Sequence, residues 1–295
     1  MDRFGYLDGS QKHSVTPQPN NKGAAVIEKT SEDSAVLLRD ENHALPLTSK
    51  DLASLALIGP TAGQVDAIGL FSERSGGLPE RQTGPLEALR HLAPEARITY
   101  AVDDDMTGTP IPANHLSHEG HPGLVRNTAG VDTVDQELNF TSSNARALPP
   151  NSSAVWSGSI SVDHDGEYWI YLQVLGGRGR LLIDGRLVSR TGATAGGMHG
   201  NTQQAGQDNG MPTLDGLDSV RHSVHLPHGQ HPIRVELTPD GSGNPVQVRL
   251  NWMSPGARIA DHEAAIKVAR AAKTVVVFVW SRESPYSVCP VIRTG

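Results

Sequence analysis

Tyr168-Trp169-Ile170-Tyr171-Leu172-Gln173-Val174 is the stretch that decides the fold of this chain. Aromatic and β-branched residues fill it, and the turn pair Asp165-Gly166 precedes it, so it predicts a β-strand. The same pattern recurs between similar turns at residues 180–183, 231–237 and 246–252. Strands separated by turn signals every 8 to 12 residues or so are typical of an antiparallel β-sandwich. We therefore expect residues 112–254 to form a β-sandwich.

Helix-like and strand-like patterns alternate on both sides of this segment. Their periodicity and their glycine and proline boundaries predict helices over 22–39, 86–92 and 260–272, buried strands at 55–58 and 274–280, and a further strand at 98–102. One α/β domain interrupted by a sandwich explains why the helix and strand pattern returns after Pro255 better than three separate folds do. We therefore predict an α/β domain built from 1–111 and 255–287, with the sandwich inserted into it.

Composition excludes several classes of protein. The 295 residues carry 25 basic and 32 acidic side chains, a formal charge of -7, without a basic stripe, so we expect no nucleic-acid partner. The longest apolar run, Val275–Trp280, is too short to cross a membrane. Met1-Asp2-Arg3-Phe4 begins no signal peptide, and the single Cys289 cannot close a disulfide within the chain. The compartment stays open.

Several short sequence words occur in an order and spacing that resemble family 3 glycoside hydrolases of the β-glucosidase type. Those of the α/β part are Arg3-Phe4-Gly5, Ser34–Arg39 with Leu45-Pro46-Leu47, Leu57-Ile58-Gly59-Pro60, Thr83–Leu89 and Val275–Val279. Those of the sandwich are Trp156-Ser157-Gly158, Gly166-Glu167-Tyr168, Leu182–Gly185, His228–His231 and Leu250-Asn251-Trp252. The chain resembles the second, α/β-sandwich domain of that family, incomplete here, interrupted by a protective-antigen-type β-sandwich module.

The resemblance implies retaining hydrolysis of terminal β-glycosidic bonds, which needs two carboxyl groups about 5 to 5.5 Å apart. In the family the nucleophilic aspartate lies in an amino-terminal barrel, and no barrel pattern is found in this chain. The acid/base glutamate of the family follows a strand like 275–280, which makes Glu283 the candidate. A solvated loop glutamate is the alternative, because Glu283-Ser284-Pro285-Tyr286 departs from the family's Glu-Gly-aromatic-Asp.

The resemblance also implies that the glycine-rich loop 72–77 reaches toward the sugar. Glu73 and Arg74 are then the candidate substrate-binding residues, since arginine donates hydrogen bonds to vicinal hydroxyls. The loop departs from the family's triple-glycine-serine pattern, so a turn without a binding role is the alternative.

Three other patterns contain residue types that can bind metal ions, but their arrangement argues against a metal site. Histidines recur every third residue at 115–121 and at 222–231, yet strands and turns point neighbouring ones in different directions. Asp103-Asp104-Asp105 is expected to be a solvated turn, and the loop 175–178 lacks the acidic pair of calcium-binding relatives. We expect no metal and no cofactor.

The sequence therefore predicts a fragment of a β-glucosidase-like hydrolase that lacks the nucleophile-bearing barrel and acts on a small glycoside or oligosaccharide. A separate barrel domain is the expected partner. A non-catalytic carbohydrate-binding protein and an inactive truncated product are the alternatives. Back-translating 288–295 in another frame gives Gly-Leu-Pro-Gly-Asp-Gln-Asp-Gly, which suits the family better, so we also expect a frameshifted tail at 288–295.

Overall fold

The computed structural model describes residues 21–41, 44–64, 84–192, 207–209 and 213–279. The chain divides into two units at Leu47/Thr48, and each is described by itself. The first contains helix α1, Asn21–Ser34. Its exposed Lys29 and Asp33 pair at 2.6 Å one turn apart. The predicted helix over 22–39 is too long, because Ser31, Asp33 and Ser34, residues of low helix propensity, lie where the helix ends.

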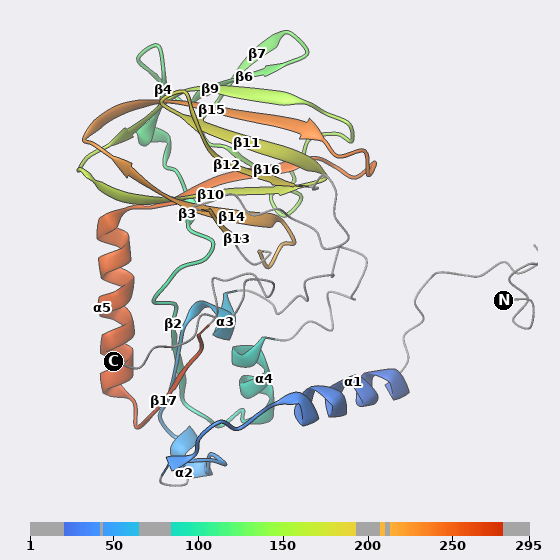
Figure 1. Ribbon diagram of the computed structural model, residues 1–295, viewed down its shortest axis with the longest axis vertical. Helices are drawn as coiled ribbons and strands as arrows, with labels where there is room; N and C mark the ends of the chain where they lie inside the picture. The colour runs from blue at the N-terminus through green and yellow to red at the C-terminus, as the bar shows by residue number, and fades with distance from the viewer. Residues whose placement is uncertain (1–20, 42–43, 65–83, 193–206, 210–212, 280–295) are drawn as a thin grey trace, which may run out of the picture. The chain divides into compact units, whose positions relative to one another are not determined.

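The second unit begins with α/β structure. A three-stranded parallel sheet has the order β17-β1-β2, with strands Leu55–Ile58 (β1), Ile98–Ala101 (β2) and Thr274–Val277 (β17). Strands β2 and β17 are labelled in Figure 1. The helices of this part are α2 (Ser49–Leu52), α3 (Pro60–Gly63), α4 (Pro85–Leu92) and α5 (Pro255–Ala271). Ala265 of α5 packs on Ala56, Ile58 and Ala101, so α5 covers one face of this sheet.

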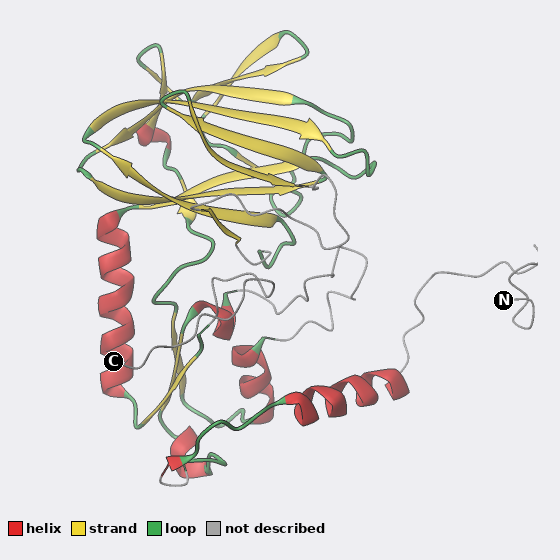
Figure 2. Ribbon diagram, in the orientation of Figure 1, coloured by secondary structure: helices red, strands yellow, loops and turns green. Residues whose placement is uncertain are grey.

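The remaining strands form two antiparallel sheets that lie face to face (Figure 2). The six-stranded sheet has the order β13-β14-β10-β16-β3 with β8 beside β16, and its strands are Thr109–Pro110 (β3), Asn139–Phe140 (β8), Gly166–Leu175 (β10), Gln207–Asn209 (β13), Asp218–Leu226 (β14) and Gln247–Met253 (β16). The eight-stranded sheet has the order β12-β11-β15-β9-β4-β5 with β6 and β7 beside β9, and its strands are Leu116–His118 (β4), His121–Pro122 (β5), Leu124–Thr128 (β6), Val131–Asp135 (β7), Ala154–Val162 (β9), Gly177–Ile183 (β11), Arg186–Gly192 (β12) and Gly229–Pro239 (β15). A 3-10 turn, η4 (Ala113–His115), leads into β4.

The core of the sandwich lies between the two sheets. It contains Trp156, Ile170, Leu172, Val235 and Leu250, all of which are fully or almost fully buried. Buried residues alternate with more exposed ones along residues 231–237 of β15 and, except at Gly158, along β9, because successive side chains of a strand point to opposite faces. Trp156 and Trp252 belong to this core, whereas the buried Trp169 belongs to a separate cluster with Tyr171 and Met253.

Most of the predicted turn pairs connect one sheet to the other. β9, β10 and β11 alternate between the sheets, and so do β14, β15 and β16. The glycine-rich residues 176–179 predict a hairpin turn, but the chain crosses there from β10 in one sheet to β11 in the other, so that prediction is wrong. Asp184-Gly185 does close a hairpin, with φ angles of 51° and 73° that suit a two-residue primed turn.

Three other predictions need correction. The carboxyl-terminal helix begins at Pro255, five residues before the predicted start, because Ser254 caps it by accepting a hydrogen bond from Ala257 N. β17 is not fully buried: Val275 and Val277 are exposed because α5 covers β1 and β2 instead. The segment 191–216 is rich in glycine and polar residues, which predicts a surface loop, but it contains β13 and the buried Thr213; residues 193–206 and 210–212 lie outside the described residues.

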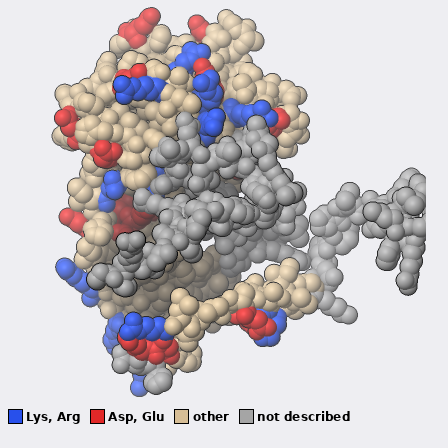
Figure 3. All heavy atoms as spheres, in the orientation of Figure 1, with Lys and Arg blue, Asp and Glu red and all other residues tan. Residues whose placement is uncertain are grey.

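No described helix combines the length and the apolar character that crossing a bilayer requires. On the face drawn in Figure 3, basic side chains lie among acidic ones.

Candidate functional site

The candidate site is the edge of the small parallel sheet at which all three strands end. Parallel pairing aligns Ile58 with Ala101 on one side and with Val277 on the other. Gly59 N donates to Ala101 O at 3.0 Å, and Phe278 N donates to Ile58 O at 2.7 Å, so the pairing continues past the strand ends. In α/β folds ligands bind outside this carboxyl edge.

Gly59 brings two backbone segments into contact at this edge. Its φ of 112° and ψ of 151° belong to a region that is essentially reserved for glycine. A Cβ atom at this position would lie 2.1 Å from Phe278 O. The residue therefore fixes how closely the chain leaving β1 approaches the chain leaving β17.

The residues predicted to contact substrate, Glu73, Arg74 and Glu283, lie outside the described residues, as does the tail 288–295. The described chain nonetheless fixes where their segments begin. Residues 65–83 continue from α3, which follows β1, and Glu283 comes after β17. Both segments are therefore joined to neighbouring strands at the same edge of the sheet.

A partly buried polar segment, residues 104–108, follows the end of β2 and was not identified from the sequence. We call this segment and its hydrogen-bonding partners the polar joint. One carboxylate oxygen of Asp105 accepts hydrogen bonds from Thr107 N at 2.8 Å and from Gly108 N at 2.9 Å. Gln64, at the end of α3, donates to the same oxygen and accepts from Met106 N at 2.8 Å. Asp105 is thus buried at a turn that α3 holds against the end of β2.

Arg221 of β14 completes the joint from the sandwich. Its fully buried guanidinium contacts both carboxylate oxygens of Asp104, at 2.6 and 3.2 Å, and lies 4.2 Å from the ring centre of Trp169. Burial lowers the pKa of Arg221, but the hydrogen bonds and charge of Asp104 outweigh this effect and raise it. Tyr171 donates to Asp105 O at 2.6 Å, which ties β10 to the same segment.

The surroundings of the joint are negatively charged. Asp261 of α5 has a raised pKa, first because it is partly buried and then because Asp105 and Asp103 repel its charged form. Burial, aided by Asp105, raises the pKa of Tyr100 to about 12. His262 bonds Asp103 through Nδ1 at 2.7 Å. The joint therefore favours groups that donate hydrogen bonds or carry positive charge.

The prediction that Asp103 to Asp105 form a solvated turn is wrong for Asp105 and in part for Asp104. Charge and periodicity suggested a surface turn, because aspartate is seldom buried without a partner. The sequence did contain a signal for the local structure: Asp105-Met106-Thr107-Gly108 has aspartate where its side chain can bond amides two and three residues ahead. The partner, Arg221, could not be identified from spacing.

The histidines serve structural roles where their contacts are described. His231 is almost buried, with Nδ1 at 2.9 Å from Asp184 and Nε2 at 2.8 Å from Pro227 O. His115 packs on Trp252 with 4.8 Å between the ring centres. Within the described ranges, no three histidine, cysteine or acidic side chains come together in a way that could hold a metal ion.

The described residues thus define an α/β protein whose parallel sheet is joined through a polar segment to a two-sheet β-sandwich. The family described as "Glycosyl hydrolase family 3 C-terminal domain" matches residues 35–286, and this chain belongs to that family. No curated protein matches the sequence.

Two solved β-glucosidases are similar to this chain. The β-glucosidase DesR from Streptomyces venezuelae, solved in complex with D-glucose, is 25% identical and superposes with a TM-score of 0.60 over 95% of this chain. This chain spans 30% of the DesR chain. A β-glucosidase from Kluyveromyces marxianus is 18% identical, with a TM-score of 0.40, and the match covers 94% of this chain and 34% of that one.

Proposed function

We propose that this chain supplies the acid/base side of a retaining β-glycoside hydrolase. Glu283 protonates the leaving oxygen, and Glu73 and Arg74 bind sugar hydroxyls. The observation that supports this assignment is the joining of both segments to one carboxyl edge, after β1 and after β17. Membership of the family and the 25% identity to DesR support the reaction class.

Catalysis of this kind needs a second carboxylate as nucleophile. We assign it to a barrel domain that acts together with this chain. The β-sandwich then limits the aglycone side of the substrate, because Arg221 and Tyr171 tie it to the segment that leaves the same sheet edge.

The test combines the chain with a separately produced family 3 barrel domain and follows release of nitrophenol from an aryl β-glucoside. The chain alone is expected to be inactive, and the mixture active. Glu283→Gln is expected to lower turnover of the mixture roughly 10²- to 10⁴-fold, because the same residue acts as the base in hydrolysis of the glycosyl-enzyme. Added azide should restore much of the turnover of an activated substrate, since a small nucleophile does not need the lost base.

A matched variant, Glu263→Gln, changes an exposed glutamate of α5 and should leave turnover unchanged. Turnover by the chain alone that is lost in Glu283→Gln would contradict the need for a second chain. Full activity of the Glu283→Gln mixture would contradict the acid/base assignment. Absence of hydrolysis in every mixture would favour the alternative, a non-catalytic carbohydrate-binding protein.

A further inference from the structure

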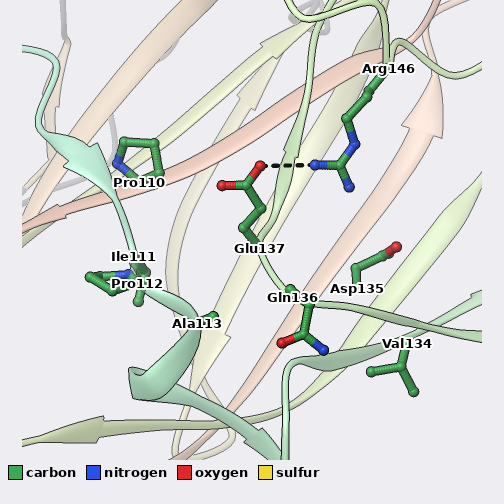
Figure 4. A pocket seen from close by; sticks show the side chains of 9 residues that line it. All are labelled: Pro110, Ile111, Pro112, Ala113, Val134, Asp135, Gln136, Glu137 and Arg146. Carbon is green, nitrogen blue, oxygen red and sulfur yellow. Dashed lines mark hydrogen bonds and ion pairs between the residues drawn. The ribbon is translucent and has the colours of Figure 1, made fainter.

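A hollow lies on the β-sandwich, and none of its lining residues belongs to the sheet edge. It has a volume of about 470 Å³, within the range of small-molecule sites. Pro110, Ile111 and Pro112 form an apolar wall, and Glu137 and Arg146 form a polar one (Figure 4). Every residue that lines it is described.

The side chains of Glu137 and Arg146 are preorganised by their contact with each other and by that of Arg146 with Phe140. The Glu137 carboxylate points toward the Arg146 guanidinium in Figure 4, with 2.8 Å between Oε1 and Nη1. Arg146 also stacks on the ring of Phe140 at 4.5 Å, and Arg126 stacks on the same ring at 4.9 Å. The Glu137 and Arg146 side chains remain about two-fifths exposed, so their outer hydrogen-bonding positions are accessible.

The local charges balance. Asp135, which lines the hollow, is buried and pairs with Arg126 at 3.0 Å while accepting a hydrogen bond from Trp156 Nε1 at 2.8 Å. Two carboxylates therefore face two guanidinium groups. A charged ligand would lose its hydration without gaining a net opposite charge, whereas a neutral ligand avoids that cost.

A ligand that fits both walls needs an apolar face and neighbouring groups that both donate and accept hydrogen bonds. Hydroxyls on adjacent carbons donate to the carboxylate of Glu137 and accept from the guanidinium of Arg146. The C–H face of a sugar ring packs against the exposed rings of Pro110 and Pro112 as other apolar surfaces do. We propose that this hollow, which we call the proline-arginine pocket, binds the ring of a neutral saccharide.

This pocket is separate from the proposed catalytic function, because it needs neither Glu283 nor a barrel. The full chain, labelled with ¹⁵N, is titrated with methyl β-D-glucopyranoside and with cellobiose. The Trp156 indole N–H, one of four in the chain, reports on the pocket through its bond to Asp135. A ligand of about a dozen heavy atoms is expected to bind with a dissociation constant on the order of 1 mM.

Glu137→Gln keeps the shape of the side chain and removes its charge, and Arg146→Met removes the donors. Each is expected to weaken binding at least 10-fold. The control Glu236→Gln alters a carboxylate that pairs with Arg180 on the eight-stranded sheet, and it should bind like the unaltered chain. Far-ultraviolet circular dichroism and thermal unfolding show that each variant is folded.

Three results would overturn the proposal. The first is no saturable shift of the Trp156 signal up to about 50 mM sugar, far above the expected dissociation constant. The second is equal binding by the unaltered chain, Glu137→Gln and Arg146→Met. The third is tighter binding of glucuronate or glucosamine than of the neutral sugars, which would show that the pocket selects charge.

Discussion

The guanidinium of Arg221 contacts both carboxylate oxygens of Asp104, although 117 residues separate them in the sequence. Arg221 lies on β14 of the sandwich, and Asp104 follows β2 of the parallel sheet. Because the arginine is fully buried and the aspartate is one-third exposed, the pair excludes water from one partner only.

Arg221→Met is expected to destabilise the protein by about 3 kcal/mol, the low end for breaking a buried ion pair, because the abandoned Asp104 can regain water. Urea unfolding measures the change. Arg180→Met removes an exposed pair with Glu236 and should cost less than about 1 kcal/mol. Equal losses in the two variants would show that burial of Arg221 does not matter.

Gly59→Ala is expected to lower the free energy of unfolding, measured by urea unfolding, by more than about 2 kcal/mol. The added methyl group would overlap Phe278 O, and alanine rarely adopts this backbone conformation. Gly120→Ala is the matched control, since its φ is 81° and no atom lies within 4 Å of the added carbon. It should cost only the backbone strain, about 1 to 2 kcal/mol. A smaller loss at Gly59 than at Gly120 would contradict the close approach of the two strands.

His231 should make stability depend on pH. Burial alone lowers its pKa, but the hydrogen bonds to Pro227 O and Asp184 outweigh burial and raise it above the ordinary value. Both ring nitrogens face acceptors, so the protonated form fits best. Its contribution is therefore full below the unfolded pKa, about 6.5, and is lost as pH rises through the higher folded value.

Urea unfolding between pH 5 and pH 9 checks this sign. His231→Gln should flatten the fall in stability over that window, and His225→Gln, a change at an exposed histidine, should leave it in place. A variant at His231 that instead steepens the fall would mean that the neutral ring is the one stabilised.

The sandwich fragment 106–254 should unfold at higher urea concentration than 112–254. The shorter fragment lacks β3, which pairs with Asn251 and Trp252, and loses the buried Ile111. Burying an isoleucine side chain contributes about 1.5 to 3 kcal/mol. Two fragments with the same midpoint would show that the sandwich does not use residues 109–111.

The sequence predicted correctly those strands that are determined by interactions between residues close together in the chain. Turn pairs and β-branched residues located β10, β11, β15 and β16, because a strand period of two and glycine turns act over a few residues. It failed at β17, because a continuous apolar run does not reveal whether a helix covers it: Val277 is 60% exposed. Periodicity cannot tell a central strand from one with an open face.

The candidate site shows the same division. Glu73, Arg74 and Glu283 were placed through resemblance to a family, and they stay predictions because their positions lie outside the described residues. The joint at Asp105 was missed because its partners come from α3, β10 and β14, and no local pattern predicts such distant contacts. Only the Asp-x-Thr-Gly turn within the joint could have been predicted from the sequence.

The pairing of β3 with β16 has a consequence for how such a chain can change over time. Trp252 lies opposite Thr109, so the path enters and leaves the sandwich at neighbouring points. For the stability of the parallel sheet, the whole segment between Thr109 and Trp252 acts as one long loop. The entropic cost of closing a loop rises only slowly with its length. A lineage could exchange or delete the whole sandwich and leave the strand order β17-β1-β2 intact, provided that it also replaced the contacts that Arg221 and Tyr171 make with Asp104 and Asp105.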